Sequence, residues 1–237
     1  MSRFVDKLKQ VSKSEPQPMG FGREKSVSKP RLLLVAETKT AAAGVVEGAD
    51  AVLMEGASKN TAARKDLPVG LRLSGSKAGK LEGMDFVVLT PGMPVAMVED
   101  EKISKVMAVE ASIELGLLRA LEDLPLDALF ITGDGEQAVT WQYLMFCRRL
   151  SSMSGKPLLA AVPPNISRDE LQMVWDAGVS GVVVAAGAAG GMKKLRSMID
   201  GLTLPAKHKK MKARAIVPSI SEKAAPAIED DEDEEEE

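Results

Sequence analysis

The sequence has very few of the residues that build thiol, histidine and base-stacking sites. Its 237 residues include one cysteine, Cys147, and one histidine, His208. An intrachain disulfide is therefore impossible, and a Ser-His-Asp, Cys-His or multi-histidine metal site would be hard to assemble. Aromatic residues make up only 3% of the chain, which argues against a surface that stacks nucleic acid bases or sugars. Cys147 itself lies in the apolar stretch WQYLMFCRRL, which predicts a buried, inert thiol.

Long apolar stretches are missing as well. No run approaches the roughly 18 apolar residues of a membrane-spanning helix, so we expect no membrane segment. The first residues, MSRFVDKLKQVSKSEPQP, lack the apolar core of a secretory signal. We therefore expect a cytoplasmic protein.

Charge is not scarce, but it is segregated along the chain. The formal net charge is −3, yet residues 229–237 are nine consecutive acids, EDDEDEEEE. Without these nine, 25 acidic residues face 31 basic ones, and 207–214 (KHKKMKAR) carry five Lys and Arg. The basic patch is short, poor in aromatic residues and offset by the acids, so a nucleic acid partner is disfavoured.

Short apolar runs recur about every 20 residues through the middle of the chain. They are continuous rather than alternating, which is typical of strands covered on both faces in a parallel sheet. Eight such runs occur, at residues 31–37, 49–55, 68–74, 85–90, 105–111, 126–132, 156–162 and 179–185.

Helical patterns lie between several of these runs. The stretch SIELGLLRALEDL has a single apolar stripe, and SRDELQMVWDAG opens with Ser167 and Glu170 at the spacing of a capping box. Eight strands that mostly alternate with helices favour a compact (β/α)₈ TIM barrel. The alternative is an open, doubly wound sheet. It is disfavoured because the glycine-rich turn follows the last strand rather than the first.

We expect three regions along the chain. Residues 1–29 form a partly ordered, flexible leader with a short amphipathic turn, 30–204 form the barrel, and 205–237 form a mostly disordered tail that is first basic and then acidic. Between the fourth and fifth strands, PGMPVAMVEDEKIS has two prolines and no helical stripe. The fourth helix is therefore expected to be irregular or missing.

Candidate catalytic residues follow the strands. In a barrel of this kind, the carboxyl ends of the strands face the ligand, and there the sequence places Glu37, Lys39, Glu55, Glu110 and Asp134. Carboxylates gathered at one mouth need a cation, a lysine or a proton, and Mg²⁺ would suit such oxygen ligands. Alternatively, these acids simply favour the dipoles of the helices that follow them.

The turn after the last strand is the candidate phosphate site. In GVVVAAGAAGGMKKLRSMIDGL (181–202), glycines 187, 190 and 191 would let the backbone approach an anion, and Lys193 would add charge. The turn after the seventh strand, VPPN, lacks the backbone donors that would complete such a cradle. A tight turn that packs the last helix is the alternative.

The stretch ISRDELQMVWDAGVSGVVVAAGAAGG resembles the last quarter of phosphate-binding TIM barrels such as indole-glycerol-phosphate synthase and thiamine-phosphate synthase. The resemblance implies that Gly187, Gly190 and Gly191 contact a phosphate. It carries over no catalytic signature. Flavin is disfavoured, because flavin barrels of this type usually have a glycine pair after the seventh strand, where this chain has PPN.

Two functions remain open at this point. The first is an enzyme, a lyase, isomerase or synthase, acting on a small phosphorylated metabolite. The second is a non-catalytic barrel that acts as a binding or scaffold protein through its charged termini.

Overall fold

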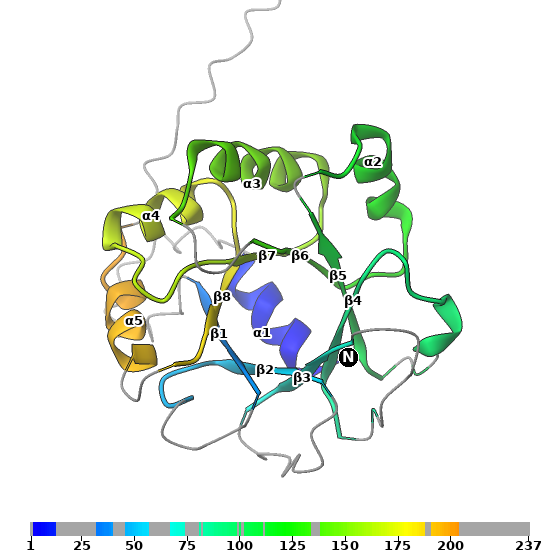
Figure 1. Cartoon of the computed structure of the whole chain (residues 1–237), viewed down its shortest axis with the longest axis horizontal. Coiled ribbons are helices and arrows are strands. Elements are labelled where there is room, and N and C mark those ends of the chain that lie inside the picture. Colours follow the sequence, from blue (N-terminus) through cyan, green and yellow to red (C-terminus); the bar gives the residue numbers. More distant parts are fainter. Residues whose placement is uncertain are drawn as a thin grey trace, which may run out of the picture. The chain divides into compact units, whose positions relative to one another are not determined.

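Eight parallel strands close into a barrel (Figure 1). The computed structural model describes residues 2–12, 32–39, 46–56, 67–73, 81, 83–98, 100, 102–110, 112–133, 138–187 and 191–203. The strands pair in chain order, and β8 returns to pair with β1 through Leu33 and Gly181, so the open sheet is wrong and the (β/α)₈ barrel is confirmed. The strands are β1 (Leu33–Thr38), β2 (Ala51–Glu55), β3 (Val69–Arg72), β4 (Phe86–Leu89), β5 (Ser104–Val109), β6 (Ala128–Ile131), β7 (Leu158–Ala161) and β8 (Gly181–Ala185).

The last four strands are each followed by an α-helix on the outside of the barrel. These helices are α2 (Leu115–Asp123), α3 (Trp141–Met153), α4 (Arg168–Asp176) and α5 (Gly191–Asp200). The predicted capping box starts α4, where Ser167 and Glu170 exchange hydrogen bonds. After β4, the described residues contain only a 3₁₀ turn, η1 (Val95–Met97), which confirms the irregular fourth helix. None of the helices within the described ranges is long and apolar enough to cross a membrane.

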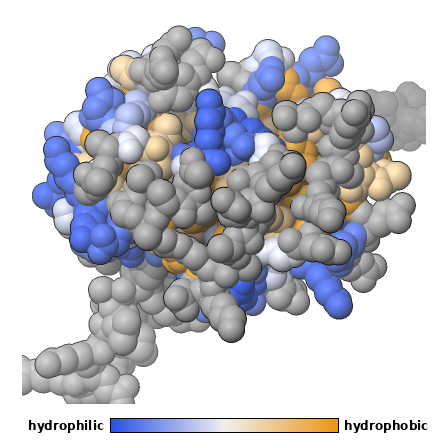
Figure 2. All heavy atoms as spheres, turned by 60° about the horizontal axis from the view of Figure 1, so that its bottom comes forward, coloured by the Kyte–Doolittle hydropathy of each residue, from blue (hydrophilic) through white to orange (hydrophobic). Residues whose placement is uncertain are grey.

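Strand side chains point alternately into and out of the barrel and so divide the core in two. In β1, Leu33 and Val35 point inward, whereas Leu34 and Ala36 pack outward toward the helices. Cys147 of α3 belongs to the outer core, is fully buried, and has a pKa raised to about 12 by burial, as expected for an inert thiol. On the side that Figure 2 brings forward, hydrophobic residues are visible between the grey atoms.

The first helix of the chain fills the amino-terminal end of the barrel, which is the lower end in this description. The helix α1 (Arg3–Ser12) extends the amphipathic turn expected there, and Phe4, Val5 and Leu8 are buried among the inward-facing strand residues (Figure 1). The Phe4 ring stacks on Phe86, with centroids 3.9 Å apart.

Gly70 of β3 makes room for this stack. A Cβ at Gly70 would lie 2.2 Å from the Phe86 ring, so only glycine leaves the space that Phe86 occupies.

Polar contacts also hold α1 at the amino-terminal end of the barrel. Lys7 Nζ donates to the Asp50 carbonyl, and Arg3 pairs with Asp85. Both aspartates immediately precede a strand, so α1 closes the amino-terminal end of the barrel.

One backbone clamp recurs at every second strand. Asp50, Asp85 and Asp127 stand just before β2, β4 and β6, and their carboxylates accept hydrogen bonds from the N–H groups of Leu34, Val69 and Lys105, respectively, at 2.9–3.0 Å. The N–H of each aspartate donates in return to the carbonyl of that same residue. Before β8, Ser180 takes this place and donates its N–H to the Leu158 carbonyl. The clamp joins each odd strand to the next even one.

The remaining parts of the predicted leader and tail, residues 13–29 and 205–237, lie outside the described residues. They include the basic patch and the run of nine acids.

We expect Phe4→Ala to destabilise the protein by about 3–5 kcal/mol, because the substitution empties a fully buried space and removes the stacking partner of Phe86. The measurement is urea unfolding of the full chain. Gln10→Ala, on the exposed face of the same helix, is the matched control and should change the free energy of unfolding by less than about 0.5 kcal/mol. Equal effects of the two substitutions would contradict the placement of α1.

Candidate functional site at the carboxyl-terminal mouth

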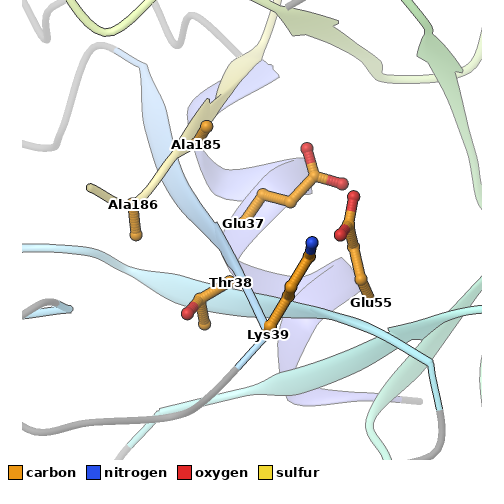
Figure 3. Close-up of a pocket in the computed structure, with 6 residues that line it drawn as sticks. All are labelled: Glu37, Thr38, Lys39, Glu55, Ala185 and Ala186. Atoms are coloured by element: carbon orange, nitrogen blue, oxygen red, sulfur yellow. The ribbon is translucent and has the colours of Figure 1, made fainter.

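The upper end of the barrel interior is charged. Continuing the inward alternation of Leu33 and Val35 along β1 places Glu37 at the top of the strand, and the same alternation places Glu55 at the end of β2. Glu37, Thr38, Lys39, Glu55, Ala185 and Ala186 line a cavity of about 340 Å³. Figure 3 shows the charged ends of Glu37, Lys39 and Glu55 directed toward one another, with the two alanines of the β8 side opposite them. Three of the five predicted catalytic residues thus share one cavity.

Glu37 is the most unusual ionisable group of this cavity. Its side chain is only 16% exposed, and burial raises the pKa of its carboxyl above the ordinary value. Arg72 opposes this shift: its Nη2 lies 2.7 Å from Glu37 Oε1 and favours the charged form. The negative charge of Glu55 adds to the upward shift. Burial and Arg72 therefore act on the Glu37 carboxyl in opposite directions, and the net result is a raised pKa.

Arg72 was missed at the sequence level, although it carries the positive charge next to Glu37. It lies in the apolar run 68–74, which is typical of a buried strand, and its role depends on the direction of its side chain. A signal was present in the two-residue alternation: Leu71 and Leu73 belong to the outer core, so Gly70 and Arg72 face the interior. The strand register places Arg72 next to Glu55, because these two residues pair across β2 and β3.

The other two predicted acids are not placed in this cavity. Glu110 follows β5, on the opposite side of the barrel from β1, where it is exposed and accepts a hydrogen bond of 3.4 Å from the Ser112 hydroxyl. Asp134 lies outside the described residues. Their predicted catalytic roles stay predictions.

The glycine turn begins where the cavity wall ends. Ala185 and Ala186 line the cavity, and Gly187 follows them directly. Gly187 and Gly191 do not have positive φ angles, and a Cβ at either would meet nothing within 4 Å. Among the described residues, neither strain nor close packing requires these two glycines, and the tight turn stays an alternative to a phosphate site. Gly190 lies outside the described residues.

Lys193, the fourth predicted phosphate contact, points to a neighbouring loop. Its Nζ lies 2.8 Å from Glu47 Oε1, and both side chains are more than half exposed. An exposed pair of this kind contributes at most about 1 kcal/mol and is easily exchanged for another anion.

Two carboxylates, Glu37 and Glu55, line the cavity. Within the part of the chain that the structure describes, no third acid, histidine or cysteine joins them to form a group of metal ligands. Mg²⁺ is often held by one or two carboxylates together with waters and substrate oxygens, so a magnesium ion at this mouth stays a prediction.

Comparison with known proteins shows which solved structures have a similar fold. No protein-family model and no curated protein matches the chain. Among solved structures, thiamine phosphate pyrophosphorylase from Pyrococcus furiosus is similar with a TM-score of 0.51 and 18% identity, covering 72% of this chain and 96% of that one. A mutant tryptophan synthase alpha-subunit from the same organism has a TM-score of 0.55 at 13% identity, covering 72% of this chain and 97% of that one. The resemblance to phosphate-binding TIM barrels is thereby confirmed at the level of the fold.

We expect Glu37→Gln to stabilise the protein as the pH rises above the ordinary glutamate pKa. Because the pKa of Glu37 is raised in the folded state, the fold binds a proton that the unfolded chain releases, and wild-type stability falls over this interval. Glutamine mimics the protonated form and avoids that loss. The melting temperatures of the two proteins should be close at pH 4 and diverge by pH 7.

Glu110→Gln controls for the loss of one negative charge at an exposed strand end. A Glu37→Gln protein that is no more stable than wild type at any pH would contradict the electrostatic description of this carboxyl.

Proposed function

We propose that the chain is an enzyme, a lyase, isomerase or synthase, that acts on a small phosphorylated metabolite at the carboxyl-terminal mouth of its barrel. The observation that carries the proposal is a mostly buried glutamate with a raised pKa in the wall of a cavity that ends at a glycine turn. Acid–base catalysis near neutral pH needs a carboxyl of this kind, and ligands of barrel enzymes bind at this end.

Glu37 and Glu55 divide the proton transfers between them. Glu37 is buried and its pKa is raised, so it acts as the proton donor, whereas Glu55, at the exposed end of β2, acts as the acceptor. Lys39 lies beside them at the cavity wall and stabilises negative charge that develops on the substrate (Figure 3). Glu110, on the far side of the mouth, belongs to the proposed set as well, and so does Asp134, which lies outside the described residues.

The phosphate binds at the turn between β8 and α5. Gly187, Gly190 and Gly191 supply backbone N–H groups, and the amino-terminal end of α5 adds its dipole. Lys193 turns from Glu47 to the phosphate, which costs little because the pair is exposed. The open space at Gly187 and Gly191 and the fold of the similar structures support this assignment.

Phosphate binding is tested by thermal shift with inorganic phosphate and a panel of phosphorylated sugars. We expect stabilisation of about 2.7 kcal/mol at a ligand concentration 100 times Kd, and its loss in Gly191→Asp. The new carboxylate finds open space and suits the start of a helix, so the variant should fold while repelling phosphate. Gly116→Asp, in the first turn of α2 and equally open, is the matched control and should bind as wild type does. Equal phosphate binding by the two variants would show that the turn is not part of the phosphate site.

The acid–base role is tested by proton exchange. We expect the protein to catalyse exchange of carbon-bound hydrogen of one member of the same panel with D₂O, measured by proton NMR. Glu37→Gln should slow this exchange by about 10²–10⁴-fold while retaining phosphate binding. Substrate binding without exchange in the wild-type protein would contradict the catalytic part of the proposal.

A further inference from the structure

Arg72 bridges two sides of the barrel below the cavity. From the end of β3 its guanidinium carbon lies 5.2 Å from the centre of the Phe130 ring of β6, while Nη2 lies 2.7 Å from Glu37 Oε1 of β1. A planar guanidinium stacks well on a ring face and keeps its donors in that plane, so Phe130 restricts where Nη2 can lie. The position of the positive charge is thus set by the barrel wall.

The guanidinium of Arg72 contacts the carboxyl of Glu37. Arg72 is absent from the residues that line the cavity, whereas Glu37 lines it. Arg72 Nε has no contact with solvent and no hydrogen-bond partner among the described residues. Glu37 thus lies at the cavity, and Arg72 acts on its carboxyl through the contact of 2.7 Å.

Burial alone favours the protonated form of Glu37. Three charged groups face its carboxyl: Arg72 from β3, Glu55 from β2 and Lys39 from the end of β1. Lys39 is exposed and its long side chain is mobile in comparison with a stacked arginine. Arg72 is the one of these groups that is both cationic and held by a partner on the far side of the barrel.

We propose that Arg72 is a positioning residue that holds the Glu37 carboxyl at the floor of the cavity and keeps its ionised form accessible, with Phe130 as the support for the guanidinium. The inference rests on the proposed acid–base role of Glu37. With Arg72 in place, the carboxyl can lose its proton to the substrate and regain it within one reaction cycle. Without Arg72, the pKa of the carboxyl rises further and the contact of 2.7 Å that holds it is lost.

The test measures the titration of Glu37 directly, in the full chain, and needs no substrate. Glutamate labelled with ¹³C at the carboxyl gives one NMR signal per residue, and Glu37→Gln assigns the signal of Glu37. We expect its titration midpoint to move to higher pH in Arg72→Met, which keeps the length and apolar packing of the side chain. In Arg72→Lys, which keeps the charge, the midpoint should lie between those of the wild-type protein and Arg72→Met. Phe130→Leu should move the midpoint in the same direction as Arg72→Met, by a smaller amount.

Arg119→Met removes the same charge from the exposed face of α2 and should leave the Glu37 signal in place. An unchanged midpoint in Arg72→Met, or an equal change in Arg119→Met, would overturn the positioning role. The measurement is independent of phosphate binding and proton exchange. A failure of the proposed function and a failure of this inference are therefore distinguishable.

Discussion

Closure of eight parallel strands forces every second side chain into one narrow interior, and the rest of the molecule follows from what the sequence places there. The lower positions are small or apolar, and they accept the Phe86 ring and the buried face of α1. The upper positions of β1, β2 and β3 are Glu37, Glu55 and Arg72. The interior is therefore filled with apolar side chains at the amino-terminal end and charged at the carboxyl-terminal end.

This gradient explains why the charges at the mouth interact strongly. A carboxyl at the top of β1 sits above a column of apolar side chains and loses much of its hydration. Arg72 and Glu55 then act on it in opposite directions through a medium that screens them poorly. Because α1 fills the base of the barrel, the described cavity belongs to the carboxyl-terminal mouth. One end of the barrel interior is packed with apolar side chains, and the other end carries the charged groups.

The sequence predicted the barrel well because the signal for a buried parallel strand is local. Each of the eight apolar runs overlaps a strand, and the prolines of 90–103 correctly predicted the irregular connection. The grouping of Glu37, Lys39 and Glu55 was also predictable, since the carboxyl ends of adjacent strands must meet.

The features that the sequence could not predict depend on the direction of side chains and on contacts between residues far apart in the sequence. Arg72 looked like part of a strand, and only its inward direction brings it to Glu37 and Phe130. The amphipathic turn containing Phe4 gave no sign that it would enter the barrel, because its partner Phe86 lies more than 80 residues away in the sequence. Lys193 carries the right charge for an anion, but its contact with Glu47 depends on the packing of α5 against residues 46–50.

The aspartate clamp at the amino-terminal end has a consequence for how such a chain can change. The same hydrogen bonds join β1 to β2, β3 to β4 and β5 to β6, so the base of the barrel repeats with a unit of two strands. Each unit contributes its own residues to the opposite rim. Substitutions at the rim leave the clamp intact, and a two-strand module can thus acquire new chemistry while its foundation stays the same.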